Sequence, residues 1–278
     1  MVEQNIILTG IPRSGTTLVC HLLNQLSNVL ALVEPMDIGE LVQQQRAEGR
    51  NAYINSFFSS IRKQILNDGR VEAKVVSGSG TNTFNSGYVG ARTPSLISHG
   101  VIDLTERYSA NFKLIVKHPN AFSALLPELS DQFSCYAVIR NPLSVLASWN
   151  SLDHPLSVGH APMAEAFDER LRQALDAEPD DLERQLMLID WYYQQYEKYL
   201  DAANIIRYED VIASKGAVLS SIDPSAHDLR ETLASRNSNA LYNTDFMVQA
   251  FERLQLNSAH SCWRFYKVGE IKGVFDQI

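Results

Sequence analysis

An apolar run at residues 5–9 leads directly into the segment GIPRSGTT at residues 10–17. A strand, a glycine-bounded loop and a helix start, in that order, point several backbone N–H groups at one anion. The spacing Gly-x-x-x-x-Gly is that of a phosphate loop, but Thr16 stands where an enzyme of nucleoside triphosphates has lysine. The positively charged residue of this segment is instead Arg13, which lies inside the loop. The segment therefore predicts a phosphate site that lacks the lysine for a β/γ-phosphate pair.

Apolar strands alternate with helical patterns along the rest of the chain. This alternation predicts one α/β domain over residues 1–278, with a central parallel β-sheet flanked by helices. The predicted strands are 5–9, 29–33, 112–116, 135–139 and 204–207, and the predicted helices are 16–26, most of 38–66, 121–129, 142–149 and 181–200, with a mostly helical remainder. Because parallel strands end at one edge of a sheet, the polar groups at these ends are expected to lie together, where ligands bind.

The composition of the chain indicates which partners and which cellular location to expect. The 278 residues carry a formal net charge of −8, and this sign disfavours nucleic acid and sulfated polysaccharide as partners. The three cysteines are irregularly spaced, which predicts buried reduced thiols and neither a disulfide framework nor a metal site. We see no apolar span long enough for a membrane and no signal peptide before the first strand. We therefore expect a cytoplasmic protein with no membrane partner.

A second cationic segment follows the predicted strand 135–139. Arg140 stands at the strand end, Pro142 suits the first turn of the next helix, and Ser148 comes eight residues after Arg140. That distance is about two helical turns. An arginine beside a helix start, with a serine hydroxyl nearby, can hold a second phosphate by charge-assisted hydrogen bonds.

Together these segments resemble the family of sulfotransferases that use 3′-phosphoadenosine 5′-phosphosulfate (PAPS), with motif spacing most similar to the tyrosyl-protein and related bacterial members. The resemblance implies a P-loop-type sulfotransferase fold, sulfuryl transfer with 3′,5′-ADP as product, and no metal. The residues that match the family's donor-binding motifs are Pro12, Arg13, Ser14, Gly15, Thr16 and Thr17 for the 5′-phosphosulfate end, Arg140 and Ser148 for the 3′-phosphate, Tyr208 for the adenine, and Trp263 with Arg264 in the covering segment.

The resemblance also implies roles at the reacting centre. Arg13 is expected to meet the charge that grows on the bridging oxygen, while backbone N–H groups of residues 14–17 and the hydroxyls of Thr16 and Thr17 hold the 5′-phosphate. Lys117 is similar to a lysine that some members place beside the transferred group.

Two residues are candidates for the general base. Glu34, after the apolar stretch 29–33, resembles the catalytic glutamate of the tyrosyl-protein and related bacterial enzymes. A carboxylate at the mouth of an apolar pocket would have a raised pKa, which suits a base near neutrality. His118 is the alternative, because the cytosolic phenol and steroid enzymes use a histidine two residues after a lysine. Here His118 directly follows Lys117, so Glu34 is favoured.

The acceptor is expected to be a small molecule, a natural product with a hydroxyl or an amine. Candidate lining residues are Phe84 and Tyr88 in the glycine- and serine-rich loop 77–94, Tyr53 and Phe57, and the stretch 154–160. The loop 77–94 is either a flap over a ligand or a disordered surface excursion.

Two other functions remain open, and the oligomeric state is not predicted. A nucleotide kinase or NTPase could use the same loop, although Thr16 and the lack of a clear strand-end aspartate for magnesium argue against it. A non-catalytic nucleotide-binding relative is the other alternative.

Overall fold

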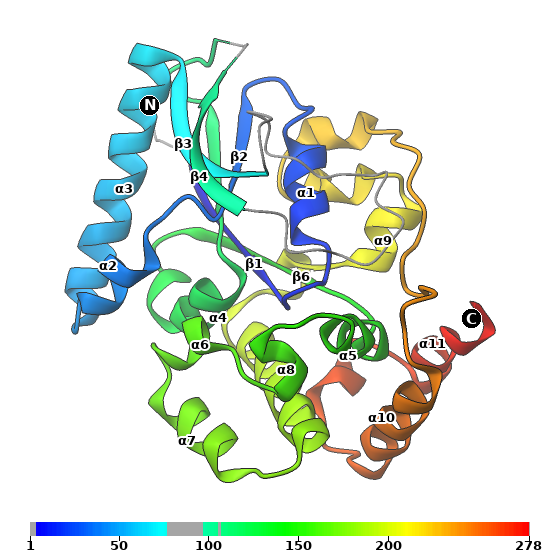
Figure 1. Cartoon of the computed structure of the whole chain (residues 1–278). Helices are drawn as coiled ribbons and strands as arrows, with labels where there is room; N and C mark the ends of the chain where they lie inside the picture. The colour runs from blue at the N-terminus through cyan, green and yellow to red at the C-terminus, as the bar shows by residue number, and fades with distance from the viewer. Residues whose placement is uncertain (1–3, 77–96, 105–106, 278) are drawn as a thin grey trace.

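Five parallel strands form the central sheet of the computed structural model, which describes residues 4–76, 97–104 and 107–277 (Figure 1). In spatial order they are β2 (Val29–Val33), β5 (Lys113–Lys117), β1 (Gln4–Gly10), β6 (Ser134–Ile139) and β7 (Ile205–Arg207). All neighbouring pairs are parallel. The α/β class predicted from the sequence is confirmed, and the ends of the predicted strands are correct to within one residue.

Both faces of this sheet are covered by helices, and the central residues of its strands are apolar, as burial on two faces requires. Along β1, Ile7 packs into one buried cluster, whereas Ile6 and Leu8 pack into a second cluster on the other face. Helices of the first cluster are α3 (Ala47–Asp68), α4 (Pro119–Leu129), α5 (Pro142–Asn150), α8 (Asp181–Tyr199) and α10 (Thr244–Leu256). Those of the second are α1 (Thr16–Leu23) and α9 (Tyr208–Ala213).

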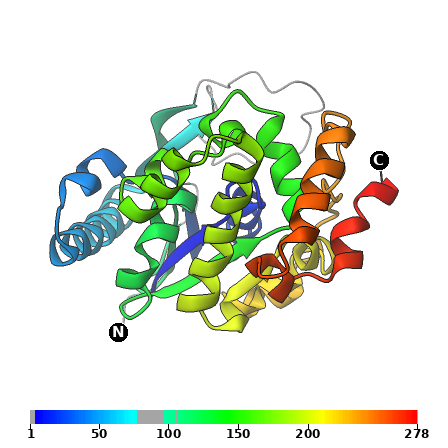
Figure 2. The same ribbon diagram turned by 90° about the horizontal axis from the view of Figure 1, so that it is seen from below.

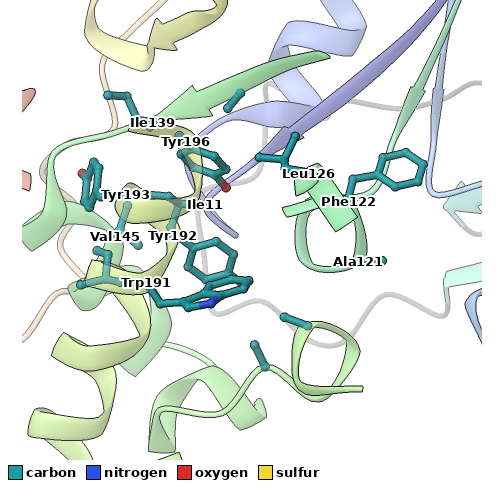
Figure 3. Close-up of a cluster of buried hydrophobic side chains, with 14 of the residues drawn as sticks. Ile11, Ala121, Phe122, Leu126, Ile139, Val145, Trp191, Tyr192, Tyr193 and Tyr196 are labelled. Carbon is teal, nitrogen blue, oxygen red and sulfur yellow. The ribbon is translucent and has the colours of Figure 1, made fainter. Parts of the chain in front are cut away.

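The aromatic residues of α8 are part of the core (Figure 3). Tyr192, Tyr193 and Tyr196 are fully buried, and Trp191 is nearly so. Ile11, at the start of the loop after β1, belongs to the same cluster. These aromatic residues therefore serve packing between α8 and the rest of the core.

The strand ends meet at one edge, as predicted. Leu8 and Val33 both pair with Lys117, and Gly10 pairs with Val138. The chain runs from β1 to β2 on one side, whereas α4 carries it from β5 across to β6 on the other side of β1. Connections thus diverge at β1, and such a divergence is the usual ligand position in an open parallel sheet.

Some local expectations were wrong. The first helix ends at Leu23 and not at 26, because the Asn24 side chain exchanges two hydrogen bonds with the backbone of Ala31 and turns the chain into β2. The strands β3 (Arg70–Val76) and β4 (Ile97–Asp103) form an antiparallel pair that was not predicted. The predicted loop 77–94, with Phe84 and Tyr88, lies outside the described residues.

The remaining helices are short. They are α2 (Ile38–Gln43), α6 (Pro162–Glu165), α7 (Glu169–Ala177) and α11 (Val268–Lys272), with 3-10 turns at Pro155–Val158, Ala202–Asn204, Ala217–Ser221, Pro224–Asp228, Ser261–Arg264 and Phe275–Gln277. From below, α3 and the orange and red C-terminal helices lie at opposite sides of the molecule (Figure 2). Within the described ranges, each helix is too short or too polar to cross a bilayer.

The three cysteines, Cys20, Cys135 and Cys262, are buried free thiols, as predicted.

Candidate functional site

The loop after β1 is anchored from behind by its neighbours. The Ile11 amide and the Ser14 hydroxyl both donate to the Val138 carbonyl, at 3.1 Å and 2.7 Å. The buried Trp149 indole donates to the Pro12 carbonyl at 2.9 Å. The Ser14 amide closes a turn onto Ile11 O. The Ser14 amide, predicted to hold the 5′-phosphate, therefore donates within the loop, and the Ser14 hydroxyl donates to β6.

The two loop glycines are required by close backbone and ring approaches. Gly10 has φ near 153°, and a Cβ there would lie 2.5 Å from the Val138 carbonyl oxygen. Gly15 has φ near 100°, and a Cβ there would lie 2.7 Å from Cδ2 of Tyr208. The glycine spacing read from the sequence thus reflects how tightly this loop sits between β6 and the start of α9.

The start of α1 presents a donor set that suits an anion. Gly15 is its N-cap and supplies no side-chain cap, and the first helical bond runs from the Val19 amide to Gly15 O. The amides of Thr16 and Thr17 precede that bond, so they are among the donors that a helix leaves for an outside partner. Thr16 is buried and Thr17 is partly exposed. Their predicted contact with a phosphate fits this geometry.

Arg13, Arg140 and Ser148 are brought together at the loop, although 135 residues separate the first from the last. Arg13 Nε donates to Ser148 Oγ at 3.2 Å. Arg140 Nη1 donates to the Arg13 carbonyl at 3.0 Å. Arg140 and Ser148 are both buried. These contacts confirm the expectation that the polar groups which follow the parallel strands lie together.

Arg140 is also held by a segment that the sequence analysis did not single out. Its Nε donates to Asn237 Oδ1 at 2.8 Å, and its Nη2 donates to the Arg236 carbonyl and, at 3.5 Å, to the Tyr242 hydroxyl. Both residues 236 and 237 lie in the extended connection 229–243 that runs to α10 (Figure 1). The sequence signal that could have indicated this segment is a polar run without helical periodicity, Ser235-Arg236-Asn237-Ser238-Asn239.

Tyr208 lies between the loop and Arg140. The Cζ atom of Arg140 is 4.7 Å from the centroid of the Tyr208 ring, and the hydroxyl accepts from the Arg236 amide at 2.9 Å. Burial raises the pKa of Tyr208, and the charge of Arg140 opposes part of that effect. The tyrosine that the motif singled out is thus part of the site, and its contact with an adenine stays a prediction.

Glu34 and Lys117 form an ion pair at the ends of β2 and β5. Lys117 Nζ donates to Glu34 Oε1 at 2.8 Å, and the Glu34 amide donates to the Lys117 carbonyl at 2.8 Å. The lysine side chain is 4% exposed and the glutamate side chain is 28% exposed. Burial raises the pKa of the nearby Cys20 thiol to about 12; the charge of Lys117 lowers that pKa and the charge of Glu34 raises it, both by less than burial does. The pair therefore presents its carboxylate to solvent and its ammonium to the interior.

His118, the alternative base, has its Nε2 occupied. That nitrogen accepts from the Met36 amide at 3.1 Å, and the ring packs edge-on against Phe122. The side chain is buried. An Nε2 that accepts a hydrogen bond has its lone pair engaged, so it is poorly placed to remove a proton from an acceptor.

Two of the predicted catalytic residues have unusual backbone conformations. Arg13 has φ of 75° and Glu34 has φ of 48°; among the described residues, the other non-glycine positions with positive φ are Asn28 and Lys215. Left-handed φ disfavours a residue with a Cβ, typically by 1–2 kcal/mol or so. Such strain is retained where the side chain is needed, and it clusters at functional sites.

Trp263 and Arg264 lie in the 3-10 turn Ser261–Arg264, which packs on α8. The Trp263 indole donates to Asn257 O at 2.9 Å, and the largely exposed Arg264 pairs with Glu197. These contacts of the pair are with α8 and with the end of α10, not with the loop after β1. The covering role that the motif implied for them stays a prediction, whereas the connection 229–243 does contact Arg140.

Of the predicted acceptor residues, the structure describes Tyr53, Phe57 and the stretch 154–160. The Tyr53 hydroxyl contacts Glu40 at 3.2 Å, and burial together with this carboxylate raises the pKa of Tyr53 to about 12. Phe57 packs on the core. In the stretch 154–160, His154 caps a 3-10 turn, and His160 lies 3.3 Å from Glu165.

One group of possible metal ligands contrasts with the expectation of no metal. His160, Glu165 and Asp176 each place a ligand atom within 4.8 Å of the others. Arg172 pairs with Asp176, and Arg184 lies 3.4 Å from the other ring nitrogen of His160. Two cations beside three ligands oppose the binding of a third cation.

No protein-family model and no curated protein matches this sequence. Among solved structures, the chain is similar to the crystal structure of sulfotransferase STF1 from Mycobacterium tuberculosis, with 14% identity and a TM-score of 0.31 over 100% of this chain and 78% of that chain. A TM-score this low does not establish a shared fold, so the function of this chain has to be inferred from its own residues.

Proposed function

We propose that this chain is a sulfotransferase that moves a sulfuryl group from PAPS to a hydroxyl or an amine of a small molecule. The observation that carries the proposal is the contact of Arg140 with the Arg13 carbonyl, next to the bond from Arg13 Nε to Ser148 Oγ. It joins the phosphate loop to the second cationic segment, and PAPS has two phosphate positions to match them.

The residues present fit such a donor. The amides of Thr16 and Thr17 and the Arg13 side chain form one set of donors, and the Arg140 guanidinium with Ser148 forms another. All three nitrogens of Arg140 already donate to protein acceptors. A guanidinium has five N–H groups, so a 3′-phosphate at Arg140 could accept from the second N–H of Nη1, or replace the Tyr242 hydroxyl, which lies 3.5 Å from Nη2.

The reacting centre would be the edge where β1, β2 and β5 end. PAPS supplies the sulfuryl group and 3′,5′-ADP leaves with the bridging oxygen. In the loose transition state known for phosphoryl transfer, positioning and charge stabilisation do most of the work. Arg13 would meet the growing negative charge, Glu34 would accept the proton from the acceptor, and Lys117 would hold the Glu34 carboxylate in place.

The test is turnover of PAPS. The chain is incubated with PAPS and pools of phenols, alcohols and amines, and 3′,5′-ADP release is measured with and without each pool. We expect release that depends on one pool, together with a product heavier by one sulfuryl group. An Arg13→Ala variant should lose this activity. PAPS that stays intact with every pool, in a chain that also binds no 3′,5′-ADP, would contradict the proposal.

A further inference from the structure

Glu209, in the first turn of α9, joins three segments that are distant in the sequence. Its Oε1 accepts from the Asn141 amide and from the Asn237 side-chain amide, both at 2.9 Å. Its Oε2 accepts from the Tyr266 hydroxyl at 2.9 Å. One carboxylate thus ties the start of α5, the connection 229–243 and the C-terminal region to one point.

The bond to Asn237 continues to Arg140. Asn237 is buried and uses both ends of its side-chain amide: Nδ2 donates to Glu209, and Oδ1 accepts from Arg140 Nε. An acceptor for Nδ2 therefore favours the side-chain orientation in which Oδ1 of Asn237 faces Arg140. With the amide reversed, Nδ2 would face the guanidinium, and two donors would meet.

The Asn237 backbone is fixed as well. Its carbonyl accepts from the Ser144 hydroxyl at 2.8 Å, and its amide donates to Ser235 Oγ at 3.2 Å. The residue cannot easily shift along the connection, so the orientation of its side-chain amide is the remaining variable. Glu209 supplies the acceptor that sets this orientation.

We propose that Glu209 is a positioning residue for the nucleotide site: through Asn237 it orients the Arg140 guanidinium against the carbonyl of Arg13. This inference rests on the proposed function for its consequence, because Arg140 is the residue expected to hold the 3′-phosphate. The geometry itself, Glu209 to Asn237 to Arg140 to the loop, does not depend on the ligand.

Substitutions separate hydrogen-bond geometry from charge. Glu209→Gln retains an oxygen that accepts from Asn141 and Asn237, and its amide can donate to the Tyr266 hydroxyl, so it should preserve the arrangement. Glu209→Ala removes the acceptor for Asn237. Asn237→Ala removes the hydrogen bond to Arg140 directly, and it replaces Glu209→Ala in the test if that variant does not fold. Tyr266→Phe is the matched control, because it removes only the Oε2 partner of Glu209.

The first measurement is hydrogen exchange of the Arg140 Nε–H by NMR in the unliganded protein, with the resonance assigned from Arg140→Lys. We expect a slowly exchanging proton in the wild type, in Glu209→Gln and in Tyr266→Phe, and at least about tenfold faster exchange in Glu209→Ala and Asn237→Ala. Unchanged exchange in Glu209→Ala would overturn the inference.

The second measurement is the affinity for 3′,5′-ADP by calorimetry. Loss of the positioning bond should weaken binding about five- to tenfold in Glu209→Ala. In an Arg140→Ala background the same substitution should have no further effect, because residues that act through one another are not additive. An equal loss in both backgrounds would show a general structural role and overturn the inference. If the wild type binds no 3′,5′-ADP, the proposed function fails, while the exchange measurement still decides the role of Glu209.

Discussion

The Lys117 ammonium lies 2.8 Å from the Glu34 carboxylate, across neighbouring strand ends that are 83 residues apart in the sequence. The pair sits at the same sheet edge as the phosphate loop, since Lys117 also pairs in register with Leu8 of β1. Of the two candidate bases, Glu34 is the one whose functional atoms are partly exposed, whereas His118 Nε2 accepts from the Met36 amide. The exposure of the Glu34 carboxylate and the hydrogen bond accepted by His118 Nε2 therefore make Glu34 the residue that we expect to accept a proton.

The first prediction concerns this base. Glu34→Gln should lower turnover by at least about a hundredfold, the usual contribution of a general base, and should leave the affinity for 3′,5′-ADP unchanged. His118→Gln retains an acceptor for the Met36 amide and should keep most of the activity. Both are measured by 3′,5′-ADP release under saturating PAPS. An active Glu34→Gln with an inactive His118→Gln would reverse the assignment.

The second prediction concerns the backbone at Glu34, where φ is 48°. Glycine accepts this conformation without penalty, so Glu34→Gly should be about 1 kcal/mol more stable to unfolding than Glu34→Ala. Both variants lose the partner of Lys117, which makes alanine the matched control. Urea denaturation followed by circular dichroism measures the difference. Equal stability of the two variants would mean that the backbone at this position is not strained.

The third prediction concerns the anchor behind the loop. Trp149→Phe removes the bond to Pro12 O and leaves a small cavity, so it should cost about 2–3 kcal/mol of stability and weaken 3′,5′-ADP binding. Trp191→Phe is the control, because its indole donates to Asp168 at 3.0 Å, away from the loop. Thermal denaturation and calorimetry are measured on both. If the control weakens nucleotide binding as much as Trp149→Phe, the anchor has no special role.

The fourth prediction is a pH dependence of stability. Burial lowers the pKa of His260 below its usual value of about 6.5, against the opposing effects of Asp190 and the Leu186 carbonyl. Its Nδ1 accepts from the Cys262 amide at 3.2 Å, which suits a neutral ring. Between the folded pKa and 6.5 the unfolded state binds more protons, so this contribution to stability is complete above about pH 6.5 and falls as the pH drops.

His260→Asn tests that sign, since asparagine can still accept from the Cys262 amide but does not titrate in this range. Between pH 7 and pH 5 the melting temperature of the wild type should fall more steeply than that of His260→Asn. Parallel curves would show that His260 does not contribute to the pH dependence.

Much of the architecture could be predicted because it depends on local patterns. Continuous apolar runs such as 112–116 and 135–139 mark strands buried on both faces, and the polar residues that follow them reach one edge because the strands are parallel. The segment Arg70–Val76 also alternates between polar and apolar residues, but its partner strand lies beyond a glycine-rich stretch, so no local pattern indicates the pairing.

The partners of the predicted site residues could not be predicted in the same way. The bonds from Arg140 to Arg236 and Asn237 depend on the path of an irregular connection almost a hundred residues later, which has no period in the sequence. The pairing of Lys117 with Glu34 follows from strand order, since β5 lies between β2 and β1. The pair Trp263–Arg264 was predicted from a two-residue motif, and its side chains contact Asn257 and Glu197.

The central claim is that two cationic groups meet at one loop to hold a nucleotide with both a 5′- and a 3′-phosphate. Calorimetry with 3′,5′-ADP, 5′-ADP and ATP, the first two in EDTA and the last with magnesium, tests it most directly. The account predicts micromolar binding of 3′,5′-ADP without metal and binding of 5′-ADP that is about tenfold weaker or worse, because a charge-assisted contact is lost. Strong binding of ATP with magnesium, in a protein that does not bind 3′,5′-ADP, would contradict it.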